Sequence, residues 1–489
     1  MSASQRPLYH VTPPSGWMND PNGLIYLDGE YHLFYQYIPR DRWDTTGISH
    51  PAHWGHAFSP DLIHWTHLPV ALETDHLGAI FSGSVVVDEN DSSGFFGGRP
   101  GLVAVFTQNN PNPSPQGPQV QSIAYSADRG RTWTMYARNP VISNPGPPDF
   151  RDPKVFWHTT SQFWVMVVTY QGDRVRFYRS ENLKNWQYTG EFGAPMGAHT
   201  AVWECPDLFT LPVDGDPGRT RWVLHLSTYH PTALSDHLGL QYFIGEFDGR
   251  TFSSDNPASV VLTPDYGRDN YAAITWSNLP AGDDRRLIIG WMNDWAYARR
   301  VPTEPWKGHL TVPRELRLRQ RDEAVRLIQT PATELEQLRG EHRSLANKTI
   351  TPASSVWERG VTDAMEITVV IEPGATAECG LRMHMGGGEQ TTIGYDGRMS
   401  ALFVDRTRSG RGDFSPDFLG RHGGPLKPTE GAISLHIYLD RSSVEVFGND
   451  GEVVISSLIF PETDCTGLEC YAIGGDARLV SLDVYQLQP

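Results

Sequence analysis

Three acidic residues stand in sequence settings that suit chemistry better than solvation. Asp20 and Asp152 are each followed by proline, and Glu204 lies two positions before one, with Trp or Phe close by in each case. Proline disfavours helix in the residue before it, so Asp20 and Asp152 belong to extended or turn segments. A single Asp-Pro is most often a turn, but three such carboxylates among aromatic residues indicate a site, because burying unpaired carboxylates is costly.

Three converging carboxylates fit two kinds of chemistry. Glycoside hydrolysis needs one ionised and one protonated carboxyl group, whereas an oxygen-ligated cation such as calcium needs several carboxylates. The chain contains no EF-hand loop, Walker A, Gly-x-Ser-x-Gly or His-Glu-x-x-His motif. We expect no cofactor, and the cation site stays open as an alternative to glycoside hydrolysis. One group of histidines lacks metal-ligand spacing and predicts a solvated loop and sheet edge, with metal binding as the alternative: His50, His53, His56, His64 and His67.

The elements that would position these residues are predicted to be strands. Aromatic residues make up 11% of the 489 residues, and 47 glycines and 37 prolines separate many short apolar runs, as in an all-β chain. A weak repeat places Ser, then Asp or Asn, then a closing Trp in three segments, at residues 59–65, 126–133 and 180–186. This spacing favours a β-propeller of about five blades over a sandwich for residues 1–328.

A different pattern begins near residue 328. Thr330, Pro331 and Gly340 have the positions of a helix N-cap, first turn and end, so we predict a linker helix over residues 329–344. Alternating apolar strands resume afterwards, and residues 345–489 are predicted to form a β-sandwich.

Charge, hydropathy and cysteine content limit the possible binding partners and cellular compartments. With 40 basic and 57 acidic residues, the net charge of −17 argues against nucleic acid and anionic membranes as partners. We find no apolar run long enough for a membrane span and no secretory signal at the start, so a cytoplasmic protein and a trimmed secreted one both stay open. Four cysteines form no framework, although Cys465 and Cys470 could be bridged.

The motif around Asp20, Trp17-Met-Asn-Asp-Pro-Asn-Gly23, resembles the signature of glycoside hydrolase family 32, which includes invertases, levanases and exo-inulinases. Further motifs follow in the family's order. The resemblance implies a five-bladed β-propeller followed by a β-sandwich, in agreement with the repeat. These motifs are Trp54-Gly-His56, Phe81-Ser-Gly-Ser84, Arg151-Asp-Pro153, Glu204-Cys-Pro206, Trp291-Met-Asn293, Pro313-Arg-Glu-Leu316 and, in the sandwich, Asp440–Phe447.

By this resemblance, Asp20 is the nucleophile, Glu204 the acid/base and Asp152 a transition-state stabiliser that binds fructose hydroxyls. This chemistry needs no metal, so we expect none. We expect Trp203 and Asp20 to raise the pKa of Glu204, and donors such as Asn19 to keep Asp20 ionised. Asp269 is an alternative to Asp265 as a further sugar contact. The residues that match the family's fructose pocket are Trp17, Asn19, Gln36, Trp54, Phe81, Ser82, Arg151, Asp265 and Trp291.

The expected activity is retaining hydrolysis that releases terminal fructose from sucrose or β-linked fructans. A fructosyltransferase and a non-catalytic fructan-binding protein are the alternatives. The chain has Gln36-Tyr-Ile-Pro39 where the family commonly has Gln-Tyr-Asn-Pro, and a long segment over residues 40–53 that includes Trp43, so substrate preference stays open. The sandwich could also mediate contact between copies of the chain.

Overall fold

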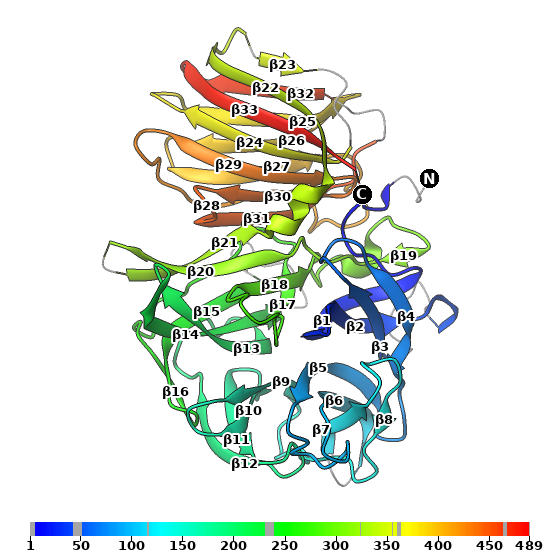
Figure 1. The fold of residues 1–489 in the computed structure, drawn as a ribbon. Coiled ribbons are helices and arrows are strands. Elements are labelled where there is room, and N and C mark those ends of the chain that lie inside the picture. The colour runs from blue at the N-terminus through cyan, green and yellow to red at the C-terminus, as the bar shows by residue number, and fades with distance from the viewer. Residues whose placement is uncertain are drawn as a thin grey trace.

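Two β domains make up the molecule, a propeller and a sandwich stacked on it (Figure 1). The computed structural model describes residues 5–42, 51–114, 117–229, 239–322, 324–354, 356–358, 363–462 and 467–488. Trp43, His50 and Cys465 lie outside these residues. The fold is nearly all-β, as the sequence predicts. Within the described part of the chain, no helix is long and apolar enough to cross a membrane.

The propeller has five four-stranded blades, which confirms the prediction from the repeat. Blades I to III are β1 (Gly16–Leu27), β2 (Glu30–Ile38), β3 (His53–Ser59) and β4 (Thr66–Leu72); β5 (Ala79–Asp88), β6 (Gly101–Ser114), β7 (Gly117–Ser126) and β8 (Thr134–Met135); and β9 (Phe150–His158), β10 (Phe163–Tyr170), β11 (Arg174–Ser180) and β12 (Gln187–Phe192). Blades IV and V are β13 (Val202–Val213), β14 (Asp216–Tyr229), β15 (Leu240–Phe247) and β16 (Phe252–Ser254); and β17 (Tyr271–Thr275), β18 (Arg286–Trp291), β20 (Arg314–Arg321) and β21 (Ala324–Pro331).

The innermost strands form a closed ring around the propeller axis. β1, β5, β9, β13 and β17 each contact the next, and β17 returns to β1. The closure is hydrogen-bonded, because Tyr26 N donates to Ser277 O at 3.0 Å and Ser277 N donates to Leu24 O at 3.0 Å. The short strand β19 (Trp306–Lys307) also pairs with β1.

The repeated Ser-x-Asp/Asn motif is one turn used in three blades. In the first copy Ser59 Oγ donates to Asp61, whose Oδ1 accepts from Ile63 N and His64 N, and Trp65 Nε1 closes the turn on Leu62 O at 2.9 Å. The second and third copies close in the same way through Trp133 and Trp186. Each copy joins the third strand of its blade to the fourth, so the repeat marks the blade period.

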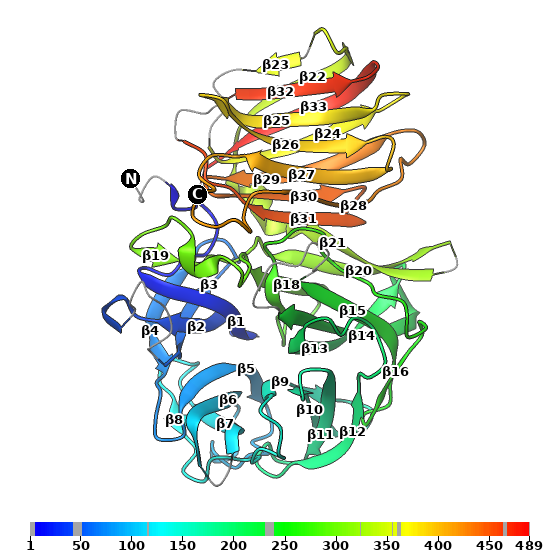
Figure 2. The same cartoon turned by 180° about the vertical axis from the view of Figure 1, so that it is seen from behind.

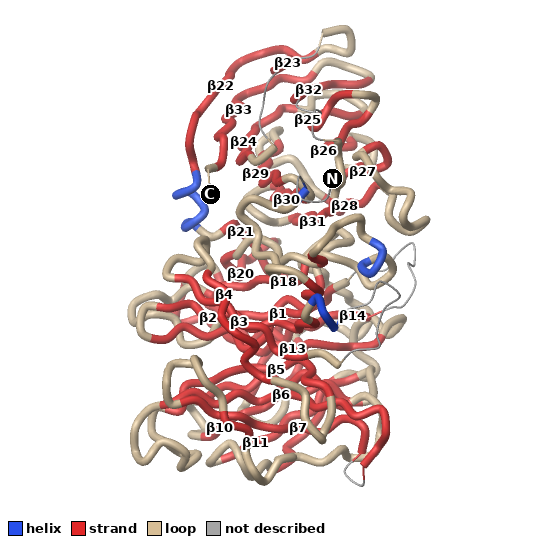
Figure 3. The backbone as a smooth tube through the Cα atoms, turned by 90° about the vertical axis from the view of Figure 1, so that its right-hand side faces the viewer, coloured by secondary structure: helices blue, strands red, loops and turns tan. Residues whose placement is uncertain are grey.

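The predicted linker helix over residues 329–344 is wrong in extent and type. Only η4 (Thr333–Leu338) is helical, and it is a 3-10 helix with Ala332 at its N-cap position. Thr330 and Pro331 instead pair with β20 as the end of β21, and β22 (Arg339–Ile350) begins directly after η4. Sheet pairing therefore overrides the local capping signal. Two further short 3-10 helices are η2 (Arg40–Arg42) and η3 (Ala298–Arg300). Figure 3 colours the helices blue.

The C-terminal domain packs two six-stranded sheets face to face (Figure 2). Their alternating inward residues form one apolar core, which includes Ile367, Leu381 and Ile437. One sheet contains β22, β33 (Ala477–Leu487), β24 (Met365–Glu372), β29 (Ile433–Asp440), β30 (Ser443–Gly448) and β31 (Val453–Leu458); the other contains β23 (Val356–Glu358), β32 (Gly467–Ile473), β25 (Glu378–Gly386), β26 (Glu389–Asp396), β27 (Ala401–Arg408) and β28 (Arg421–Pro425).

A buried polar network joins the two domains. His10 lies between Asp440 and Glu445 of the sandwich, at 2.8 and 2.9 Å from its two ring nitrogens. Arg314 of β20 also pairs with Glu445, and with Asp265 at 3.1 Å. These ionisable groups have 2% or less of their side chains exposed, so the contacts fix how the sandwich sits on the propeller.

Candidate active site

Each innermost strand has a β-bulge near its first residues. Asp20, Asp152 and Glu204 all lie at this level, on β1, β9 and β13, and the strands run away from it in a common direction along the ring. Asp152, Cys205 and Ala272 have φ angles of 65, 47 and 51°, which turn the chain locally into the left-handed region. The pairing of each strand with its neighbour shifts between Met18 and Pro21, Ile80 and Gly83, Arg151 and Lys154, Glu204 and Asp207, and Tyr271 and Ile274.

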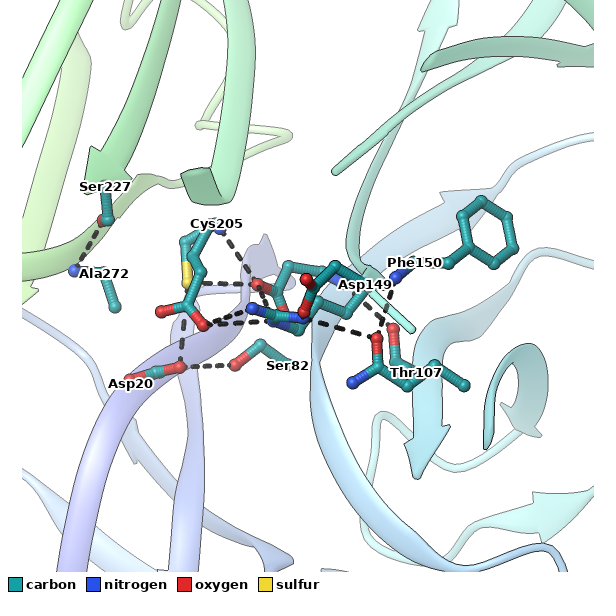
Figure 4. A network of polar contacts seen from close by, with 12 residues as sticks. Asp20, Ser82, Thr107, Asp149, Phe150, Cys205, Ser227 and Ala272 are labelled. Carbon is teal, nitrogen blue, oxygen red and sulfur yellow. Dashed lines mark hydrogen bonds and ion pairs between the residues drawn. The ribbon is translucent and has the colours of Figure 1, made fainter. Parts of the chain in front are cut away.

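These bulges bring the three carboxylates into one cluster. Cys205 Sγ lies 3.7 Å from Asp20 Oδ2 and 3.7 Å from Asp152 Oδ2, while its backbone N donates to Asp152 Oδ2 at 3.0 Å. Glu204 is the residue directly before Cys205 in the chain. Figure 4 shows Asp20, Ser82 and Cys205 meeting from three different strands. The predicted convergence of the three acids is therefore present in the structure.

Asp20 is held by two side-chain donors. Asn19 Nδ2 donates to its Oδ1 at 2.9 Å, and Ser82 Oγ donates to its Oδ2 at 2.7 Å. Trp17 Nε1 donates to Asn19 Oδ1 at 2.6 Å, which fixes the orientation of the Asn19 amide. Burial and the nearby charge of Glu204 raise the pKa of Asp20, whereas the two donors oppose this shift. The donors are thus what favours the ionised form that a nucleophile requires.

Asp152 is the most enclosed of the three acids. Only 6% of its surface is exposed, and its backbone N donates to Thr107 Oγ1 at 3.0 Å. Burial, reinforced by the charges of Glu204 and Asp20, raises the pKa of Asp152 to about 7, against the opposing effect of Arg151. A carboxyl group with a raised pKa can donate a hydrogen bond in its neutral form and accept hydrogen bonds in its ionised form.

Glu204 contacts a guanidinium and a phenol. Arg151 donates to its Oε1 through Nε at 3.0 Å and Nη2 at 2.8 Å, and the Tyr271 hydroxyl donates to its Oε2. Trp203, which the sequence suggests as a neighbour of this carboxyl group, instead packs into the apolar core with Phe243. Successive residues of a strand face opposite sides, so Trp203 cannot share the surroundings of Glu204.

Arg151 is shared among several oxygen acceptors. Its Nη1 donates to Asp149 and, at 3.4 Å, to Gln119 Oε1. Burial alone would lower the pKa of Arg151, but the charges of Glu204, Asp152 and Asp149 raise it, so the guanidinium stays charged. Arg151 therefore neutralises part of a strongly acidic cluster and fixes the position of Glu204.

Aromatic residues pack beside the carboxylates. Trp17 stacks on Trp295 at 5.9 Å, and Trp291 lies against both rings and against Tyr271. Trp291 is fully buried, so it supports Trp17 from behind.

The remaining residues predicted for the pocket lie on the strands next to the cluster. Trp54 is fully buried on β3, and its Nε1 donates to Phe81 O at 3.0 Å, one residue before Ser82. Gln36 pairs with Trp54 across β2 and β3 and is 4% exposed. These contacts give Trp54 the role of positioning the segment that carries Ser82, behind the cluster.

Asp265 and its alternative Asp269 do not join the cluster. Asp265 is paired with Arg314 and accepts from Ser456 of the sandwich, and Asp269 is paired with Arg406. Both carboxylates point to the domain interface because their segment runs along the sandwich before entering β17. Two residues later the same segment supplies Tyr271, which the sequence reasoning missed, as it missed Asp149 and Trp295. The available signal for all three is that they lie close to the motifs at 151–153 and 291–293 and to Asp269.

The predicted loop and sheet edge does not describe all of the histidine group. His53 and His56 are buried in β3, and His56 Nε2 lies 3.0 Å from His32 Nδ1, because these residues pair with β2 inside blade I. Among the described residues, no group of three or more His, Cys, Asp or Glu side chains is arranged to hold a metal ion.

The site contains three carboxyl groups at one end of a five-bladed propeller, flanked by an arginine and by stacked tryptophans. This arrangement suits glycoside hydrolysis, which uses a pair of carboxyl groups. The comparisons agree. Residues 10–331 match the family model described as "Glycosyl hydrolases family 32 N-terminal domain", and residues 334–486 match "Glycosyl hydrolases family 32 C terminal". The chain belongs to glycoside hydrolase family 32.

Curated relatives and solved structures support this assignment. A levanase from Bacillus subtilis (strain 168) is 52% identical, over 99% of this chain and 70% of the relative, and an extracellular exo-inulinase from Aspergillus niger is 39% identical, over 98% and 94%. The crystal structure of exo-inulinase from Aspergillus awamori has a TM-score of 0.90 at 37% identity, covering 99% of this chain and 98% of that one. These findings confirm the predicted family, fold class and enzyme class.

Proposed function

We propose that this enzyme releases terminal fructose from β-linked fructans and from sucrose through a covalent fructosyl intermediate. In this mechanism Asp20 attacks the anomeric carbon, and Glu204 first protonates the leaving oxygen and then activates water. Asp152 and Arg151 hold fructose hydroxyls, and the carboxylates stabilise the positive charge of the transition state. The observation that carries the proposal is the convergence of Asp20, Asp152 and Glu204 on equivalent bulges of three blades.

The substrate class rests on the relatives. The names levanase and exo-inulinase belong to proteins that align with nearly all of this chain, and a β-fructofuranosidase from Schwanniomyces occidentalis, complexed with fructosyl-erythritol, has a TM-score of 0.87 at 30% identity, over 99% of this chain and 98% of that one. Polymeric fructans do not cross membranes, so we also propose secretion. Contact between copies through the sandwich stays a prediction, which size-exclusion chromatography with light scattering would test.

Product analysis tests the proposed reaction directly. Levan, inulin and sucrose are incubated with the wild type and with Asp20→Asn, Glu204→Gln and the surface control Glu191→Gln. We expect free fructose from the wild type and the control, and losses of about 10²-fold or more in the two site variants. Rearranged or longer fructosides as the main product would replace hydrolysis with transfer, and an active Asp20→Asn would refute the assigned nucleophile.

A further inference from the structure

A second cavity lies on the propeller axis, away from the carboxylate cluster. Its volume is about 660 Å³, and residues from all five innermost strands line it, including Ile25, Val87, Phe156, Phe209 and Thr275. Pockets for small molecules have volumes of about 300–1,000 Å³, so this cavity is large enough for a ligand.

The cavity is separate from the site described above. Along β1, β9 and β13 its lining begins two to five positions after Asp20, Asp152 and Glu204, so it lies further along the axis than the carboxylate cluster. Between the two lies a buried contact in which Lys154 Nζ donates to Asp207 Oδ2 at 3.1 Å and to Thr275 O at 2.8 Å. The void on the active-site side of this contact measures only about 10 Å³, room for about one water molecule. A sugar bound at the active site cannot extend through it.

Several charged groups in the cavity are paired within the protein. Lys154 is paired with Asp207, and the carboxylate of Asp88 accepts from Ser92 N, Ser92 Oγ and Ser93 N. Arg286 stands above the Phe209 ring at 5.5 Å, and Glu89 is exposed on the cavity wall. Groups of both signs therefore line the cavity, and a neutral ligand rich in hydroxyls would meet both donors and acceptors.

An aromatic platform completes the cavity. Among the side chains that the structure describes, Trp157 is the only tryptophan that is exposed, at 39%, and it lines this cavity together with Trp222. Its ring is braced by Trp164, whose centroid lies 5.2 Å away in an edge-to-face arrangement. An indole held rigid and left open at a concave surface indicates a binding surface, because such rings are usually buried.

We propose that this cavity is a second saccharide-binding site, in which Trp157 stacks on a unit of a neutral fructan chain. The sugar type rests on the proposed function, and the site itself rests on the cavity. Such a site would anchor polymeric substrate without touching the reacting bond. It would therefore affect the KM for levan and leave hydrolysis of sucrose unchanged.

Affinity electrophoresis in gels containing levan tests this proposal in the Asp20→Asn background, where substrate is not consumed. Adding Trp157→Ala should raise the dissociation constant for levan about tenfold. Thr160→Trp adds a bulky side chain at an exposed turn position that lines the cavity, and it should raise the dissociation constant as well. Tyr188→Ala, which removes an exposed aromatic residue outside the cavity, is the matched control and should retain full affinity.

Activity assays separate this proposal from the proposed function. In the otherwise wild-type enzyme, Trp157→Ala should raise the KM for levan and leave kcat and KM for sucrose unchanged. Unchanged levan affinity in Trp157→Ala and Thr160→Trp, or an equal loss in Tyr188→Ala, would overturn the second site. Absence of fructose release by the wild type would instead overturn the proposed function, and the binding results would still decide the cavity.

Discussion

His10 makes the stability of the domain interface depend on pH. Its imidazole is buried between Asp440 and Glu445, and although burial alone would lower the pKa, hydrogen bonds and charge interactions with these carboxylates raise it from 6.5 to about 9. A pKa that is higher in the folded state than in the unfolded state means that folding favours the protonated imidazole. This contribution is complete below pH 6.5 and is lost as the pH rises through about 9. A shift of this size corresponds to about 3 kcal/mol.

The groups packed around His10 make this contribution separable from other titrations. His309 faces it at 5.5 Å, and burial lowers the pKa of His309 to about 3, so its ring is neutral throughout the alkaline range. Burial raises the pKa of Tyr9 well above 10, so Tyr9 does not lose its proton near pH 9 in the folded state. Arg314 stays charged beside Glu445.

The experiment is urea unfolding followed by tryptophan fluorescence between pH 6 and 9.5. We compare the wild type with His10→Gln, and with His342→Gln as a control that removes a half-exposed histidine paired with Asp483. At pH 6, His10→Gln should lose about 3 kcal/mol of unfolding free energy, and this deficit should shrink as the pH approaches 9.5. A deficit that stays constant with pH would show that His10 contributes by packing alone and would refute the reasoning.

Three further predictions concern single side chains. Tyr271→Phe removes the hydroxyl that donates to Glu204, so kcat/KM for sucrose should fall roughly 10- to 100-fold with the fold unchanged by circular dichroism; a change within twofold would contradict a role for this contact. Asp149→Asn removes one of the charged acceptors that hold Arg151 against Glu204, so kcat/KM for sucrose should fall about tenfold; it should stay unchanged in Asp173→Asn, whose partner is Arg174. Arg314→Met strands Glu445 and Asp265 in the interface and should cost about 3–5 kcal/mol in unfolding free energy, whereas Arg343→Met, at an exposed pair, should cost less than about 1 kcal/mol.

The propeller could be predicted because its signal is local and repeated. The turn that Ser59, Asp61 and Trp65 form is made by neighbours in the chain, and the same hydrogen bonds recur in blades II and III. The linker helix failed for the converse reason. Thr330 and Pro331 satisfy the local rule for a helix start, yet their backbones pair with β20. A local sequence pattern does not predict a pairing partner that is 15 or more residues away.

The residues of the candidate site likewise differ in whether local sequence or long-range packing places them. Asn19, Asp20 and Ser82 are positioned by bulges within their own strands, so short motifs are enough to place them. Asp265 and Tyr271 lie six residues apart in one segment, but one faces the sandwich and the other faces Glu204. Which of them enters the site depends on where that segment leaves the interface, and only the packing of two domains determines this point.

The equivalent bulges also explain why so few residues build the site. A regular strand would turn alternate side chains away from the axis, so each strand could offer the channel only every second residue. At its bulge, β9 places Arg151 against Glu204 and Asp152 against Cys205, and β13 presents both Glu204 and Cys205 to the cluster. Two consecutive residues from one strand thereby face the same cluster. The left-handed φ angles of Asp152 and Cys205 have a free-energy cost of about 1–3 kcal/mol each, which the surrounding blades must compensate. Strain at this level of the ring is therefore tied to the geometry that brings the three carboxyl groups together.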